Sequence, residues 1–196
     1  MIRLIFASHN PNKVAEIKAI LGPGFRISGL EELGLREDIP EPFHSLKENA
    51  LAKARFVHDR FKVNCFADDT GLEVTALGGK PGVQSARYAG PAKDDQANIR
   101  KLLSELSGIT DRSAQFRTVI ALILEKKEYI FEGIVKGHIT TLPGGQKGFG
   151  YDPVFIPEGY TSTFAEMEAT EKNRISHRQA AIRKLVTFLQ DISTSG

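Results

Sequence analysis

The chain has 196 residues, with 26 lysines and arginines against 24 aspartates and glutamates, and the resulting net charge of +2 argues against a dedicated nucleic-acid-binding protein. Its hydrophobic fraction of 41% can form an ample core, and we expect one domain over residues 1–196. The longest apolar run, Val119–Leu124, is too short to cross a membrane. A single cysteine, Cys65, cannot form an internal disulfide, and no secretory signal pattern is present, so we expect a cytoplasmic protein.

The first part of the chain alternates apolar segments with helical patterns. Ile2–Ala7 predicts a strand, and Pro11 begins an amphipathic helix that Asn10 suits as N-cap and that Gly22-Pro23-Gly24 ends. The segment Leu46–Phe61 predicts a second helix. After it, the pattern predicts two strands, Val63–Ala67 and Leu72–Leu77, separated by an acidic turn, Asp68-Asp69-Thr70-Gly71. This interpretation places the two carboxylates at a strand end.

The second part adds an antiparallel component to the sheet. Its predicted elements are a loop at Gly78–Gly82, a helix over Asp94–Ser107, a hairpin of Gln115–Leu124 and Tyr129–Ile139 joined at Glu125–Glu128, and a helix from Ser176 to about Ile192. Strands interleaved with helices, together with one hairpin, predict an α/β domain with a mixed sheet. In such folds, ligands bind at the loops that follow the strands.

The loop before the first helix is a candidate anion site. A helix begins with unpaired backbone N–H groups, and an ammonium stands beside them in the segment Ser8-His9-Asn10-Pro11-Asn12-Lys13. The alternative is an ordinary capped helix with a solvated lysine. Neither a Walker A pattern nor a Gly-x-Gly-x-x-Gly pattern occurs, which removes the main sequence support for P-loop ATPases and dinucleotide-binding enzymes.

Two adjacent carboxylates, Asp68 and Asp69, indicate either a Mg²⁺ site or a simple turn. Neighbouring residues there project in different directions, so we expect one of the two to face the site. Glu41 and Glu48 are further oxygen donors, although Glu48 is better explained as an acid in the first turn of a helix. Lys53 lies on that same helix, where a lysine usually faces solvent.

A third group of residues can recognise a flat, polar ligand. Glycines and aromatics surround a carboxylate in Gly148-Phe149-Gly150-Tyr151-Asp152-Pro153, which suits a nucleobase, although a glycine-rich turn with core aromatics is the simpler explanation. Hydrogen-bond donors gather at Lys172, Ser176, His177 and Arg178, with Ser176 as a candidate N-cap. The alternative is a solvated surface helix. Cys65 lies in an apolar segment and is expected to be a buried, inert thiol.

Taken together, these segments resemble the inosine triphosphate pyrophosphatase family in order and spacing. The matching segments are Ser8–Lys13 with Glu16, Glu48–Ala50 with Lys53, Phe66–Val74, Gly78–Tyr88, Gly148–Pro153 and Ser176–Arg178. They cover nearly the whole chain. The sequence departs from the family pattern at His9, at Thr70, at Gly144 and after Glu41.

The resemblance implies an elongated α/β fold with a mixed central sheet flanked by helices, two lobes with the active-site cleft between them, and a homodimer. It implies Mg²⁺-dependent hydrolysis of ITP, dITP and XTP to the monophosphate and pyrophosphate. By position, Asp69 matches the catalytic acid, and Asp69 and Glu41 match the metal ligands. The positions that match substrate-binding residues are Ser8, His9, Asn10, Pro11, Asn12, Lys13, Lys53, Thr70, Phe149, Gly150, Tyr151, Asp152, Lys172, His177 and Arg178.

Two other functions compete with this one. A Maf-like nucleotide pyrophosphatase resembles the same fold but typically carries arginines in its first loop, where this chain has Asn12-Lys13. A nucleotide-binding sensor without turnover would not need both Asp69 and Lys13. The expected partner is therefore a small nucleoside triphosphate, with no nucleic acid and no membrane.

Overall fold

A computed structural model describes residues 3–21 and 26–194. Its strands are β1 (Arg3–Phe6), β2 (Arg26–Ser28), β3 (Cys65–Val74), β4 (Pro81–Gly82), β5 (Ser113–Leu124), β6 (Lys127–Ile139) and β7 (Phe155–Pro157). The α-helices are α1 (Pro11–Leu21), α2 (Leu46–Phe61), α3 (Asp95–Glu105), α4 (Ala169–Ile175) and α5 (His177–Thr194). Short 3₁₀ turns lie at Leu30–Leu33, Thr75–Leu77, Ser85–Arg87 and Asp152–Val154. Ile2 and the predicted helix stop Gly22-Pro23-Gly24 lie outside the described residues.

The strands form one mixed sheet in the order β2-β1-β3-β5-β6-β7, with β4 paired to β3. Strand β1 is parallel to β2 and β3, whereas β4 is antiparallel to β3 and β7 to β6. The prediction of a mixed α/β sheet is thereby confirmed. Of the helices in the described residues, none is long and apolar enough to span a bilayer.

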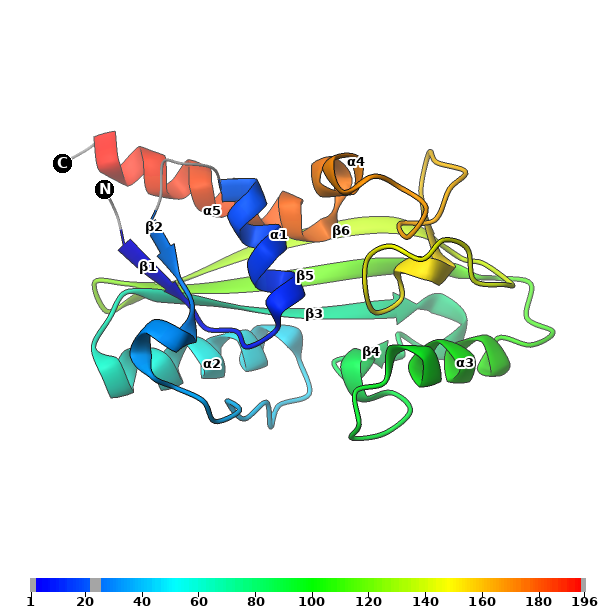
Figure 1. The fold of residues 1–196 in the computed structure, drawn as a ribbon, viewed down its shortest axis with the longest axis horizontal. Helices are drawn as coiled ribbons and strands as arrows, with labels where there is room; N and C mark the ends of the chain where they lie inside the picture. The colour runs from blue at the N-terminus through cyan, green and yellow to red at the C-terminus, as the bar shows by residue number, and fades with distance from the viewer. Residues whose placement is uncertain (1–2, 22–25, 195–196) are drawn as a thin grey trace. The chain divides into compact units, whose positions relative to one another are not determined.

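The chain divides into two compact units. Unit 1 comprises Met1–Asp69, Thr118–Gly133 and Arg178–Gly196, and unit 2 comprises Thr70–Arg117 and Ile134–His177. In unit 1, helices α1 and α5 lie on one side of the strands and α2 lies on the other (Figure 1). Each unit buries its own hydrophobic cluster, with Phe6, Phe66 and Leu185 in unit 1 and Phe116, Phe155 and Leu102 in unit 2.

The helix starts follow the side-chain chemistry of the residues before them. The side chain of Asn10 accepts from the backbone N–H groups of Asn12 and Lys13, as predicted for an N-cap. Helix α2 spans the predicted residues and begins at the N-cap Ser45, whose Oγ accepts from the Glu48 N–H and donates to the Glu48 carboxylate. Glu48 is therefore a first-turn acid that also contacts the N-cap.

The prediction of an acidic turn between two strands is wrong. Strand β3 runs without interruption from Cys65 to Val74, so Asp68 and Asp69 lie within the strand, and Thr75–Leu77 is a 3₁₀ turn. Gly71 is needed for a close approach and not for a turn, because a Cβ there would lie 2.6 Å from the Gly82 carbonyl oxygen of the paired strand β4.

The last helix begins at His177, directly after the predicted N-cap Ser176, but the helix before it was not predicted. A separate helix, α4, ends at Ile175, and the Ser176 N–H donates to the Lys172 carbonyl at its C-terminus.

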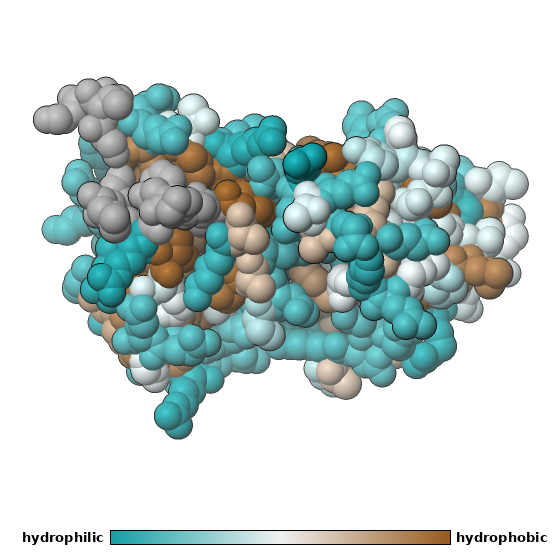
Figure 2. Space-filling view, turned by 45° about the horizontal axis from the view of Figure 1, so that its top comes forward, coloured by the Kyte–Doolittle hydropathy of each residue, from teal (hydrophilic) through white to brown (hydrophobic). Residues whose placement is uncertain are grey.

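Cys65 is fully buried, and burial raises the pKa of its thiol to about 12, in agreement with an inert thiol. On the face shown in Figure 2, hydrophilic side chains predominate and hydrophobic side chains form smaller groups among them.

The predicted hairpin is confirmed, and its tight turn generates a stability prediction. Glu125 and Lys126 have φ values of 50° and 67°, a left-handed conformation that glycine adopts without steric cost. Lys126→Gly should therefore raise the melting temperature by about 2 °C in thermal denaturation. Lys127→Gly is the matched control, since it places glycine at the first residue of β6 and should lower stability. A lower melting temperature for Lys126→Gly than for Lys127→Gly would contradict this account.

Candidate active site

The candidate anion loop of unit 1 connects β1 to α1. The Asn10 N–H donates to Ser8 Oγ at 3.2 Å, and His9 Nε2 lies 3.0 Å from the Glu37 carbonyl oxygen. Pro11 and Asn12 are exposed at the start of α1. Asn10 Oδ1 accepts from the backbone N–H groups of Asn12 and Lys13, so these two groups are already hydrogen-bonded. The group of this loop that can attract an anion is therefore the ammonium of Lys13, which contacts Asp68.

Asp68 is the centre of a buried ion-pair network. Lys13 Nζ lies 3.1 and 3.0 Å from its two carboxylate oxygens, and Arg178 Nε lies 3.5 Å from Oδ2. Arg178 also forms a close ion pair with Glu16 of α1. Asp68 and Arg178 are only 1% and 2% exposed. Burial by itself raises the pKa of Asp68, but Lys13 and Arg178 outweigh it and hold that pKa well below its usual range.

Asp69 contacts a different helix from its neighbour. Its Oδ1 lies 3.9 Å from Lys53 Nζ of α2, and the same ammonium donates to Glu41 Oε1 at 2.6 Å. Successive side chains of a strand point to opposite faces of the sheet, which explains why Asp68 meets α1 and α5 whereas Asp69 meets α2. Lys53 is buried and so does not follow the usual pattern of a solvent-facing lysine.

The electrostatics of this second group suit a divalent cation. Burial raises the pKa of Asp69 against the opposing effect of Lys53, and the carboxylates of Glu41 and Asp68 raise it further. Asp69 and Glu41 thus repel each other across one ammonium. Within the described ranges no group of three or more His, Cys, Asp or Glu side chains is arranged to hold a metal. Mg²⁺ does not require one, since it commonly takes one or two protein carboxylates together with water and phosphate oxygens, so the donor set fits.

In unit 2, Asp152 organises the glycine-rich segment. Its Oδ2 accepts from the Phe149 N–H at 2.9 Å and from Lys172 Nζ at 2.7 Å. The same ammonium lies 4.9 Å from the centroid of the Phe149 ring. Asp152 and Lys172 are both buried, so their contacts with the glycine-rich segment belong to the protein interior and not to a solvent-exposed turn.

The other predicted base-recognition residues occupy both units. Tyr151 donates through its hydroxyl to the Ser85 carbonyl at 2.8 Å, and the His177 ring stacks on Phe116 with centroids 4.7 Å apart. These residues belong to unit 2, as does Thr70, which follows Asp69 on β3. Arg178 belongs to unit 1 and contacts carboxylates there. The predicted hydrogen-bond donors therefore belong to different units, Lys172 and His177 to unit 2 and Arg178 to unit 1.

Sequence reasoning missed the network around Asp68. The two aspartates project in different directions, as predicted, but the sequence did not show that each of them meets a buried cation. One signal was available: Glu16 follows Lys13 by three residues and so shares its helix face, which places an acid and a base together at the start of α1.

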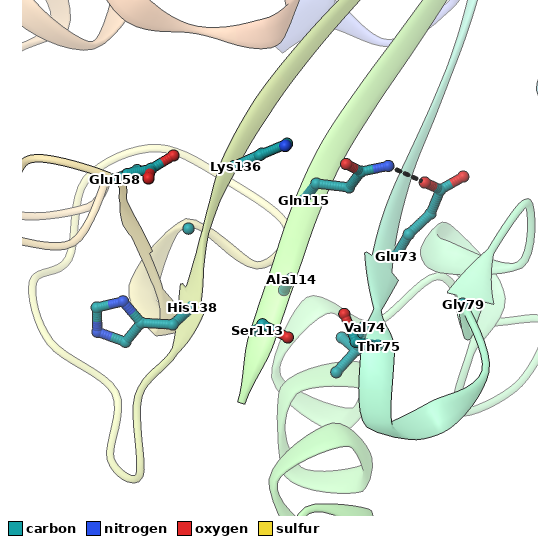
Figure 3. A pocket seen from close by; sticks show the side chains of 11 residues that line it. Glu73, Val74, Thr75, Gly79, Ser113, Ala114, Gln115, Lys136, His138 and Glu158 are labelled. Atoms are coloured by element: carbon teal, nitrogen blue, oxygen red, sulfur yellow. Dashed lines mark hydrogen bonds between the residues drawn. The ribbon is translucent and has the colours of Figure 1, made fainter. Parts of the chain in front are cut away.

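Unit 2 also carries an open pocket that the sequence did not indicate (Figure 3). Its volume is about 600 Å³. The lining residues include Glu73, Gln115, Lys136, His138 and Glu158, and Gln115 donates to Glu73 at 2.6 Å. None of the eleven lining residues is a predicted site residue.

Comparison with known proteins adds the family. Residues 4–188 match the model of the Ham1 family. The chain belongs to the Ham1 family. The resemblance drawn from the motifs is thereby confirmed.

This Ham1-family chain is similar to several dITP/XTP pyrophosphatases and to solved Ham1 proteins. A dITP/XTP pyrophosphatase of Porphyromonas gingivalis is 55% identical, and the match covers 96% of this chain and 98% of the relative. One from Bacillus subtilis is 48% identical, with coverages of 97% and 98%. The solved Ham1 protein of Staphylococcus aureus is 40% identical with a TM-score of 0.89, covering 97% of this chain and 99% of its own. A Ham1 protein from Coxiella burnetii gives 38% identity and a TM-score of 0.90, with coverages of 97% and 100%.

The two aspartates of this Ham1-family chain should differ in their effect on stability. Asp68→Asn removes the carboxylate that Lys13 and Arg178 share, and breaking such a buried pair costs about 3–5 kcal/mol. Asp69→Asn should cost less, because Lys53 keeps its contact with Glu41 at 2.6 Å. Urea denaturation of both variants measures the difference. An equal or larger loss of unfolding free energy in Asp69→Asn would contradict this assignment.

Proposed function

We propose that this protein hydrolyses non-canonical purine nucleoside triphosphates, namely ITP, dITP and XTP, to the monophosphate and pyrophosphate. The relatives named dITP/XTP pyrophosphatase support this activity. The observation that carries it is the convergence of Asp69 and Glu41 on Lys53, close enough to Lys13 for that ammonium also to act on the charge of Asp69. Carboxylates and ammonium groups so arranged suit a metal-bound polyphosphate. No observation favours a Maf-like enzyme or a non-catalytic sensor.

Asp69 and Glu41 are the residues we propose to hold Mg²⁺. When bound, Mg²⁺ supplies charge that offsets the phosphate oxygens and favours attack at phosphorus. The carboxylate of Asp69 accepts the proton of the attacking water. Attack at the α-phosphorus then releases pyrophosphate, and no covalent enzyme intermediate is needed.

The cations of unit 1 are proposed to bind the phosphates. Lys13 and Lys53 stabilise the charge of the departing pyrophosphate. Ser8, His9, Asn10, Pro11 and Asn12 shape the loop that precedes Lys13, and Thr70 adds a hydroxyl next to Asp69. In the structure both lysines contact carboxylates, so they are already oriented and need little side-chain ordering when the phosphate arrives.

The residues of the glycine-rich segment and the donors Lys172, His177 and Arg178 are proposed to recognise the base. Phe149 offers a stacking surface, and Gly150, Tyr151 and Asp152 hold it in place. Lys172, His177 and Arg178 donate to the carbonyl at purine position 6, which ITP and XTP share. ATP presents an amino group there, which cannot accept the hydrogen bonds that the carbonyl of ITP and XTP gains, a difference of about 1–3 kcal/mol for each bond.

The remaining parts of the proposal concern the protein as a whole. We propose that residues 1–196 act as one pyrophosphatase domain, as a homodimer, in the cytoplasm, with neither nucleic acid nor membrane as partner. The single buried cysteine supports the proposed cytoplasmic location. The near balance of charges supports the absence of a nucleic-acid partner. Sedimentation of the purified chain measures the oligomeric state.

The activity is tested with a panel of ITP, XTP, dITP, GTP, ATP and dTTP, with and without Mg²⁺. We expect IMP and pyrophosphate from ITP in equal amounts, and turnover of ITP and XTP far above that of ATP. Release of IDP and orthophosphate, or equal turnover of all purines, would contradict the proposal.

Asp69→Asn should reduce ITP hydrolysis by at least ~100-fold while the protein stays folded, because the metal site and the proton acceptor both lose a charge. Steady-state kinetics at saturating Mg²⁺ measure the loss, and circular dichroism confirms the fold. If the variant retains more than about a tenth of the wild-type turnover, Asp69 is not the main proton acceptor of the reaction.

Arg178→Ala separates base recognition from the support of Asp68. If Arg178 recognises the base, the variant loses most of its kcat/KM for ITP. The ratio of kcat/KM for ITP to kcat/KM for ATP then becomes smaller. If its contacts with Glu16 and Asp68 are its whole role, all purines lose activity alike. The experiment compares kcat/KM for ITP, GTP and ATP at a temperature where the variant is folded, and we expect the ratio to narrow.

A further inference from the structure

The loop that carries Phe149 has a backbone conformation that must be held from outside. Gly148 and Gly150 have φ values of +76° and +61°, and a Cβ on Gly148 would lie 2.1 Å from Asp152 Oδ2. Glycine is the residue that loses most conformational freedom on folding. A loop with two such glycines keeps one shape only if other groups fix its peptides.

Three side chains fix this loop, and two of them belong to the proposed base site. Asp152 accepts from the Phe149 N–H, and Tyr151 reaches the Ser85 carbonyl. The third comes from a distant part of unit 2: Asp95 Oδ2 accepts from the Gly150 N–H at 2.7 Å. Asp95 lies in the first turn of α3 and precedes Gly150 by 55 residues.

The residue before Asp95 shows that the contact is not a by-product of helix capping. Asp94 is the N-cap of α3, and its Oδ1 accepts from the Ala97 N–H at 3.0 Å. Asp95 is therefore not needed for the cap. A first-turn acid gains a little from the helix dipole, but that gain does not require its carboxylate to reach Gly150.

We propose that Asp95 is a positioning residue for base binding. Its carboxylate holds the peptide between Phe149 and Gly150, which fixes the plane of the Phe149 ring beneath Lys172. This inference rests on the proposed function, because it assumes that Phe149 stacks on a purine. Since Asp95 acts on the binding of the base and not on bond cleavage, its loss raises KM and leaves kcat nearly unchanged.

Three variants test this proposal. Asp95→Ala should raise KM for ITP roughly tenfold, the value of one hydrogen bond to a charged group, with kcat almost unchanged. Asp95→Asn keeps an acceptor oxygen and should stay within about twofold of the wild type. Asp94→Ala is the matched control, which removes the cap of the same helix: it should lower the melting temperature without changing KM.

Hydrogen exchange of the Gly150 amide gives a second measurement that does not depend on activity. Exchange should become faster in Asp95→Ala than in the wild type and in Asp94→Ala. The inference is overturned if KM is unchanged in Asp95→Ala, if Asp94→Ala raises KM equally, or if Gly150 exchange does not respond. A wild type that hydrolyses neither ITP nor XTP would instead overturn the proposed function, and the exchange comparison would still decide whether Asp95 holds the loop.

Discussion

The ion pair between Lys13 and Asp68 allows two adjacent carboxylates to lie inside a strand. An aspartate that is 1% exposed would normally take up a proton, because burial disfavours its charged form. Lys13 at 3.0 Å and Arg178 at 3.5 Å reverse that preference, and Glu16 in turn balances Arg178. Helices α1 and α5 are thus joined to β3 by charge as well as by the hydrophobic cluster beneath them. Strand β3 can therefore continue through a segment whose composition is typical of a turn.

The alternation of side chains along β3 then separates two tasks. Asp68 faces α1 and α5, where its partners are cations, and it has a charge-balancing role. Asp69 faces α2, where Lys53 and Glu41 form a mixed group of charges that a divalent cation and a phosphate can join. Two residues of one type, one position apart, therefore differ in chemistry because the pleat of the strand gives them different neighbours.

Much of this was accessible from sequence, and the failures have physical reasons. The α2 range, the Asn10 cap and the hairpin follow from local periodicity and capping chemistry, which depend on near neighbours. The break placed in β3 was wrong because Asp and Gly favour turns locally, whereas partners from α1 and α5, far away in the chain, supply the compensating charge. The division of His177 from Arg178 was equally inaccessible, since adjacent positions at a helix start do not show which core each side chain joins.

The central claim is that Asp68 is the shared counter-charge of Lys13 and Arg178. A double-mutant cycle of Asp68→Asn and Arg178→Met in urea denaturation tests it most directly. If Arg178 needs Asp68, removing both should cost less than the sum of the single losses, by a coupling free energy of about 1–3 kcal/mol. Strictly additive losses would show that the two groups do not depend on each other and would contradict the account.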